Sequence, residues 1–221
     1  MELFRRYGKQ YELLKQMLGN RISKFPRQRL NEIFMVTEKK WEENLDRYAG
    51  KEVEYLLIAE APPWTPENRD EIKFFYNTFS QPLKSRIWKT FFDSPAPNNV
   101  NLSLDQLAMN RFLLVDSVPF AIKYESRDRR KGIYTDLVRQ SAPYLMKKLQ
   151  HKNVKLSRDI RVAIGFRLNG IAMIEAYTKK ISLNTGRVLK LNDGIIATDG
   201  SGYPNSEKLR EIFGYNGHNS H

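Results

Sequence analysis

Cysteine is absent from this chain of 221 residues, and histidine is scarce. Without cysteine the chain has no disulfide, no thiolate zinc site and no iron–sulfur cluster. The three histidines are His151, His218 and His221, and the last two lie in a polar C-terminal stretch. We therefore expect neither a histidine-based metal centre nor a Ser-His-Asp triad, and we expect no cofactor.

Long apolar runs are missing as well. No stretch approaches the roughly 18 apolar residues of a membrane span, and the N-terminus lacks the apolar core of a signal peptide. We therefore expect a soluble monomer with no membrane partner. It would be cytoplasmic, or in the nucleoid or nucleus when bound to DNA.

Acidic residues are scarce over one long segment, residues 123–190. The segment contains 17 of the 37 Lys and Arg residues but only 5 of the 25 Asp and Glu residues, and so accounts for the whole net charge of +12. A basic segment beside a neutral remainder is typical of a protein that binds a polyanion such as nucleic acid. The alternative is a solvated basic face without a specific partner.

An apolar run over residues 55–59 is followed directly by Glu60 and then by Pro62 and Pro63. Such a run is typical of a strand buried on both faces of a parallel sheet, and the prolines end it. Glu60 is therefore expected at the carboxyl end of the strand, which is where open α/β sheets bind ligands. The alternative is a loop glutamate that points into water.

The same pattern recurs at residues 112–115, which are apolar and are followed by Asp116 and Pro119. Two acids at the same edge of a sheet predict a cleft between them. The alternative for Asp116 is an acid that pairs with an arginine or caps a helix. Further strands are expected at residues 160–165 and 195–199.

Helical patterns separate these strands. They are expected up to Gly19, from Pro26 to Gly50, from a Thr65 cap to residue 79, and over residues 87–92, 135–150, 168–177 and 207–213. This alternation predicts an α/β class fold, a three-layer α/β/α sandwich around a central four-stranded parallel sheet. We expect a helical N-terminal extension (1–52), the α/β domain (53–213) and a flexible tail (214–221). The extension is alternatively a partner-binding arm.

The four strand ends together resemble the uracil-DNA glycosylase superfamily over residues 53–213. Ala59-Glu60-Ala61-Pro62-Pro63 is similar to the family's Gly-Glu-Ala-Pro-Gly motif, and Leu113-Leu114-Val115-Asp116 occupies the place of apolar residues followed by a base-reading Asn. Gly165 matches a glycine that ends the third strand. Tyr203-Pro204-Asn205-Ser206 matches the family's His-Pro-Ser and the helix after it.

The resemblance implies a DNA glycosylase-like hydrolase that cleaves the N-glycosidic bond of a flipped, damaged or modified base. Glu60 would stabilise the oxocarbenium-like sugar or orient the attacking water, and Tyr203 would donate a hydrogen bond to the leaving base. Asp116, Phe75 and Ala61 would contact the base. The residues expected at the nucleic-acid backbone are Arg129, Arg130, Lys131, Ser201, Asn205 and Ser206.

The sequence also departs from that family. Tyr203 replaces the histidine, and an ionised Asp116 cannot donate a hydrogen bond to a uracil carbonyl as the Asn does. The Tyr203 ring alternatively packs over its loop. Two other functions stay open: a catalytically inactive nucleic-acid or nucleotide-binding protein of the same fold, and an unrelated α/β enzyme with a phosphorylated substrate. The sequence shows no phosphate-binding loop that would support the enzyme with a phosphorylated substrate, because no Lys-Ser/Thr follows Gly200-Ser201-Gly202.

Overall fold

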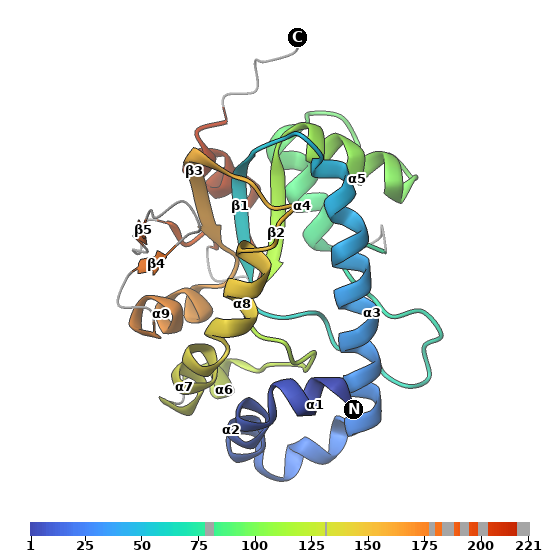
Figure 1. The fold of residues 1–221 in the computed structure, drawn as a ribbon, viewed down its shortest axis with the longest axis vertical. Helices are drawn as coiled ribbons and strands as arrows, with labels where there is room; N and C mark the ends of the chain where they lie inside the picture. The colour runs from blue at the N-terminus through green and yellow to red at the C-terminus, as the bar shows by residue number, and fades with distance from the viewer. Residues whose placement is uncertain are drawn as a thin grey trace.

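The computed structural model has a central sheet of three parallel strands (Figure 1). They are β1 (Val53–Ala59), β2 (Phe112–Asp116) and β3 (Leu156–Ile164), in the order β2-β1-β3. The structure describes residues 1–77, 82–130, 132–176, 180–182, 188–190, 195–198 and 203–215. The predictions of the first three strands and of their parallel direction are confirmed, with β3 beginning earlier than expected.

The prediction of a fourth strand at residues 195–199 is wrong for the part that is described. Residues 195–198 form no strand and make one parallel bridge, between Ile164 and Ile196. Ala197 N donates to the Ile164 carbonyl at 2.9 Å. Asp199 lies outside the described residues.

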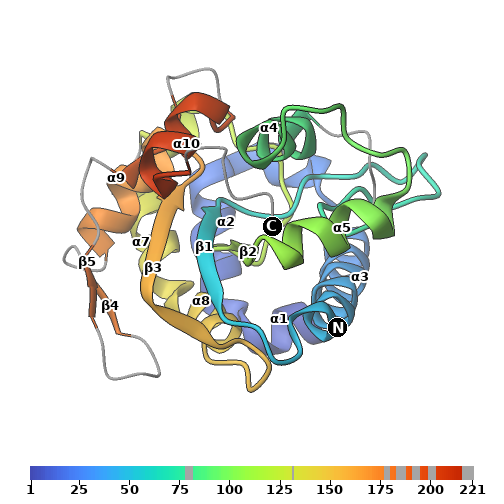
Figure 2. The same cartoon turned by 90° about the horizontal axis from the view of Figure 1, so that it is seen from above.

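Helices cover both faces of the sheet (Figure 2). One face bears α4 (Pro82–Phe91) and α10 (Ser206–Phe213), and the other bears α8 (Ala142–Leu149) and α3 (Arg27–Leu45). On the first face, the Tyr55 ring lies 5.5 Å from Phe91 and 5.2 Å from Phe213. The chain is therefore a mixed α/β protein with a parallel sheet between helices.

The N-terminal helices share the core of the sheet domain. They are α1 (Glu2–Arg6), α2 (Gly8–Leu18) and α3, joined by the 3-10 turn η1 (Gly19–Lys24), with η2 (Asp46–Tyr48) after α3. Leu3, Leu14 and Leu30 are fully buried in the same cluster as β1 and β2. The helices predicted on either side of Pro26 are confirmed.

The helix predicted from Thr65 is wrong over residues 65–77, which form turns and irregular backbone. The buried Arg29 of α3 explains the difference. Its guanidinium donates to the carbonyls of Thr65, Pro66 and Arg69 at 2.9–3.0 Å. The carbonyls of this segment therefore bind the arginine, and the Pro66 carbonyl also accepts from the Arg69 amide at 3.1 Å in a turn, instead of forming the hydrogen-bond ladder of a helix. Residues 78–79 of the predicted helix lie outside the described residues.

The single helix predicted at residues 135–150 is two helices, α7 (Gly132–Gln140) and α8, which meet at Ser141. Pro143 stands in the first turn of α8, where it has no amide to continue the ladder. The helices at the end of the chain, α9 (Arg167–Ala176) and α10, lie where they were predicted. Elements that were not predicted are α5 (Val100–Met109), α6 (Ser126–Arg129), β4 (Lys180–Ser182) and β5 (Val188–Lys190). Among the helices described, none combines the length and the apolar character that a bilayer crossing requires.

Candidate functional site: a pocket at the carboxyl edge of the sheet

A pocket of about 1000 Å³ opens where β1 and β2 end; we call it the edge pocket. Its walls include the segment after β1, the end of β2 and the segment between β2 and α6. The rings of Phe166 and Tyr203 also form part of them. The predicted site residues that line it are Glu60, Ala61, Phe75, Asp116, Arg129 and Tyr203. The structure therefore brings the two strand-end acids and Tyr203 into one pocket.

Glu60 lies directly after β1 and its carboxylate is held on both oxygens. Arg129 donates from Nε to Oε1 and from Nη2 to Oε2, each at 2.6 Å, and the Tyr134 hydroxyl donates to Oε1 at 2.5 Å. Burial, and then the charge of Glu60, raise the pKa of Tyr134 well above its ordinary value, so its hydroxyl stays protonated. Glu60 is 5% exposed, and the alternative of a loop glutamate in water is wrong.

Arg129 is positioned by α6, whose start is fixed by a capping box between Glu125 and Asp128. Asp128 is itself bound by Arg21 at 2.7 Å, which ties α6 to the N-terminal helices. Burial lowers the pKa of Arg129, but the hydrogen bonds and charge of Glu60 outweigh it and raise the pKa overall. No described residue accepts a hydrogen bond from Arg129 Nη1. The guanidinium also lies 5.0 Å from the Phe166 ring and 6.0 Å from the Tyr124 ring, measured from its carbon to each ring centre.

Asp116 ends β2, with Ala59 as its neighbour in the register. It is 3% exposed, and its Oδ2 is buried without a hydrogen-bond partner among the residues described. Burial raises the pKa of Asp116 to about 7, with Lys148 opposing and Glu38 reinforcing the shift. The alternative that Asp116 pairs with an arginine is not realised within the described part of the chain. Asp116 therefore changes its charge close to neutral pH.

A buried ion pair lies in the core on the α3–α8 side of the sheet. Lys148 is 2% exposed, and its Nζ lies 2.8 Å from Glu38 Oε1. Tyr144 donates to the same oxygen at 3.1 Å, and Lys148 stands 4.7 Å from the Tyr144 ring and 4.9 Å from the Trp41 ring. Sequence reasoning missed this pair, although Lys148 follows Tyr144 and Leu145 on the apolar side of its helix.

Aromatic rings form two walls of the edge pocket. Phe75 is 3% exposed and meets the Tyr76 ring edge-on at 4.9 Å. Tyr203 is 40% exposed, 6.3 Å from the Phe166 ring and 5.4 Å from the Arg86 guanidinium carbon. The Tyr203 ring therefore lies between Phe166 and Arg86 in the wall of the edge pocket. Residues 199–202 of its own loop lie outside the described residues, so packing over that loop stays an alternative.

Three of the other residues predicted at a nucleic-acid backbone, Arg130, Asn205 and Ser206, do not line the edge pocket. Asn205 caps α10, its Oδ1 accepting from Glu207 N at 2.9 Å and Lys208 N at 3.0 Å. Ser206 Oγ donates to the Arg86 carbonyl at 2.8 Å. Arg130 is exposed. Lys131 and Ser201 lie outside the described residues, so the phosphate contacts stay a prediction.

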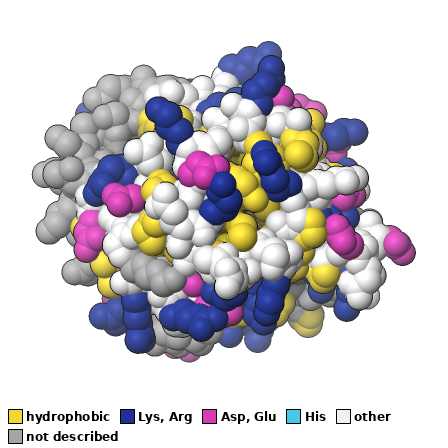
Figure 3. Space-filling model, turned by 90° about the horizontal axis from the view of Figure 1, so that it is seen from below, with side chains coloured by type: hydrophobic (Ala, Val, Ile, Leu, Met, Phe, Trp, Pro, Cys, Tyr) yellow, Lys and Arg dark blue, Asp and Glu magenta, His cyan; other side chains and the backbone are white. Residues whose placement is uncertain are grey.

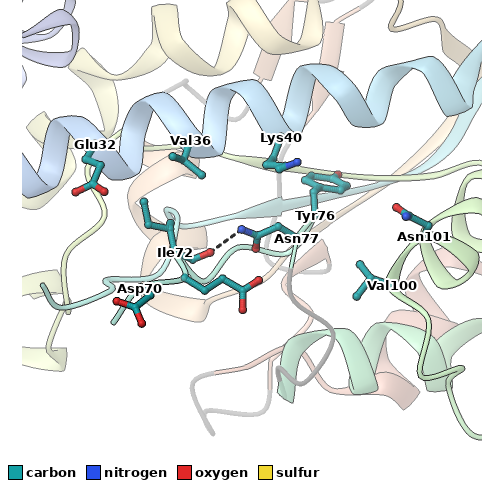
Figure 4. A pocket seen from close by; sticks show the side chains of 10 residues that line it. Glu32, Val36, Lys40, Asp70, Ile72, Tyr76, Asn77, Val100 and Asn101 are labelled. Carbon is teal, nitrogen blue, oxygen red and sulfur yellow. Dashed lines mark hydrogen bonds between the residues drawn. The ribbon is translucent and has the colours of Figure 1, made fainter. Parts of the chain in front are cut away.

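A second pocket of about 510 Å³ adjoins the first one (Figure 4). It lies between α3, the segment before residue 78 and the start of α5, and Asp70, Glu71, Asn77 and Val100 line both pockets. The Asn77 side-chain amide donates a hydrogen bond to the Ile72 carbonyl at 2.6 Å, as Figure 4 shows. None of the predicted site residues that the structure describes lines it.

Among the described side chains, which Figure 3 colours by type, the basic ones do not form one continuous patch on the face nearest α1 and α2. Lys and Arg are spread over that face, with hydrophobic and acidic side chains between them. Basic residues at the edge pocket itself are Arg69, Lys73, Lys123 and Arg129. Over the described ranges, no set of three or more His, Asp or Glu side chains is arranged to hold a metal ion.

Comparison of the chain with protein-family models, with curated proteins and with solved structures finds no match. The resemblance to the uracil-DNA glycosylase superfamily therefore rests on the strand-end residues alone.

Proposed function

We propose that the edge pocket binds a base turned out of a DNA strand and that the protein is a DNA glycosylase-like hydrolase of that base. The observation that carries the proposal is Asp116, a buried carboxyl with an uncommitted oxygen in the same pocket as the rings of Phe75 and Tyr203. A flipped base needs aromatic faces to stack on and a polar group at its edge. A pocket of about 1000 Å³ has room for a base and its sugar.

Glu60 is the group proposed to stabilise the sugar as the N-glycosidic bond breaks, because a fixed carboxylate opposes positive charge on an oxocarbenium-like ring. In the closed ion pair, however, Arg129 neutralises that carboxylate. The proposal therefore includes an exchange in which Arg129 leaves Glu60 for a DNA phosphate. Each residue would then play the part predicted for it, and Tyr203 would donate to the departing base.

The second candidate function is a base-binding protein without hydrolysis. The specific observation in its favour is the closed ion pair, in which two hydrogen bonds from Arg129 and one from Tyr134 occupy the Glu60 carboxylate. If the pair stays closed when DNA binds, Glu60 shapes the pocket and performs no chemistry. The two candidates share the same bound base and differ only in whether the glycosidic bond breaks.

The test is a panel of oligonucleotides, each carrying one modified base at the same position. Abasic sites are scored by alkaline strand cleavage under single turnover, and binding is followed by fluorescence anisotropy. Release of one base at a rate that Glu60→Gln lowers is the expected result. Base-dependent binding without release would select the second candidate. Binding that ignores the base, with no release, would overturn both.

A further inference from the structure

We infer that Asp116 reads the bound ring as a neutral carboxylic acid, so that the pocket selects rings whose edge carries a hydrogen-bond donor beside an acceptor. The inference rests on the proposed function, because it presumes a base in the edge pocket.

Within the described part of the chain, Asp116 lies in surroundings that offer its carboxylate neither a paired cation nor a donor. Among the described residues no cation lies within ion-pair distance of it, and its Oδ2 has no hydrogen-bond donor. The charged groups that act on it are Lys148 from α8 and Glu38 from α3. These two lie 2.8 Å apart and largely cancel one another. Little remains to hold a negative charge at this position.

The hydroxyl groups around Asp116 are engaged elsewhere. Tyr76 donates to the Leu114 carbonyl at 2.6 Å and accepts from the Leu114 amide at 3.0 Å. Tyr144 donates to Glu38 at 3.1 Å. Removing a carboxyl from water without donors or a nearby cation disfavours its charged form. The pKa of about 7 that burial gives Asp116 agrees with this geometry.

The two charge states of a carboxyl group differ in the hydrogen bonds that they can form. A neutral carboxyl offers one O–H donor beside one carbonyl acceptor, as the amide of Asn does, whereas a carboxylate only accepts. Hypoxanthine and guanine both present a ring N–H beside a carbonyl, which fits the neutral acid. Guanine also carries an amino group beside that N–H. The ring N–H and the amino group can each donate a hydrogen bond to one oxygen of a carboxylate, so guanine fits the charged form as well. The discrimination between these two rings should therefore follow the charge of Asp116.

The test uses three oligonucleotides that are identical except for hypoxanthine, guanine or an abasic site at one position. Anisotropy gives the affinity of each between pH 5.5 and 8.5, and the abasic strand reports changes that do not involve the base. For the wild type, the ratio of the affinity for hypoxanthine to the affinity for the abasic strand should fall roughly tenfold as the pH rises through about 7. A roughly tenfold fall is the loss expected for one hydrogen bond. The gain from guanine should persist.

Two variants sharpen the test. Asp116→Asn keeps the donor and acceptor at every pH, so its gain from hypoxanthine should stay constant. Glu38→Gln leaves Lys148 uncompensated beside Asp116, so the transition should move to lower pH. A gain that does not change with pH in the wild type, or changes equally in Asp116→Asn, would overturn this inference alone. Equal binding of all three strands at every pH would overturn the proposed function and this inference with it.

Discussion

Glu60 and Arg129 bind one another through two hydrogen bonds of 2.6 Å, across 69 residues of chain, at the point where β1 ends. Their side chains are 7% and 13% exposed, so the pair lies largely out of water. Both residues were predicted to contact a ligand. While the pair is closed, each side chain is bound by the other and neither is available to a ligand.

The ion pair should be visible in the free energy of unfolding. Glu60→Gln and Arg129→Met should each cost about 3 kcal/mol, because each leaves the other group buried without its partner. The double variant should cost less than the two single losses together, with a coupling of about 1–3 kcal/mol. Urea unfolding of the four proteins measures this. Losses that add to within about 0.5 kcal/mol would mean that the pair does not form in solution.

Glycosidic cleavage, if present, should depend on Glu60 more than on Tyr203. Glu60→Gln keeps the side-chain volume and removes the charge, and should slow single-turnover release by about two to three decades, or roughly 3–4 kcal/mol of barrier. Tyr203→Phe should cost less, because a neutral hydroxyl is a weaker stabiliser than a charged group. Both rates are compared at matched occupancy of the DNA. Equal rates for the wild type and Glu60→Gln would dismiss Glu60 as catalytic.

Stability should fall with pH because of Asp116. Its folded pKa of about 7 lies above the ordinary 3.8, so the folded protein holds a proton that the unfolded chain releases. The stability that comes from this bound proton is fully present below the unfolded pKa of Asp116. It is lost as the pH rises to and through the folded pKa. Between pH 5.5 and 8.5 the wild type should lose about 2 kcal/mol relative to Asp116→Asn. Parallel curves of unfolding free energy against pH would contradict the shift.

Nucleic-acid binding should weaken steeply with salt. Each neutralised phosphate contributes about −0.9 to the log–log slope on duplex DNA and about −0.7 on a single strand. Arg130→Glu should reduce affinity for all sequences alike, because phosphate contacts position the protein without specifying sequence. The matched control is Arg158→Glu, since Arg158 is exposed near the opposite end of β3. Equal losses in the two variants would leave only a general effect of net charge.

The N-terminal helices should be required for folding. A fragment that begins at residue 53 would expose the surface of the core that Leu14, Leu30 and Phe34 cover. We expect this fragment to lack a cooperative unfolding transition. In the full chain, Leu14→Ala should cost about 2–5 kcal/mol, as for other fully buried leucines. A fragment that unfolds cooperatively would show that the helices are a separable arm.

The sequence alone was sufficient to place the two strand-end acids. A short apolar run stopped by proline leaves Glu60 at the end of β1, a second such run does the same for Asp116, and parallel strands bring their carboxyl ends to one edge. Local periodicity likewise predicted the helices before residue 50, where one apolar stripe faces the core. These features depend on neighbours a few residues apart, which a sequence displays directly.

Contacts between distant segments decided the rest. Arg29 forms hydrogen bonds to backbone carbonyls that a helix after Thr65 would have used for its own ladder. Arg129 binds Glu60 across 69 residues of chain, a contact that no local spacing in the sequence indicates. The charge state of Asp116 depends on how completely β2 and the surrounding helices exclude water from it, and burial is a property of the packed chain. The sequence thus determined which groups reach the edge of the sheet, while the tertiary structure decided which of them are occupied and which are charged.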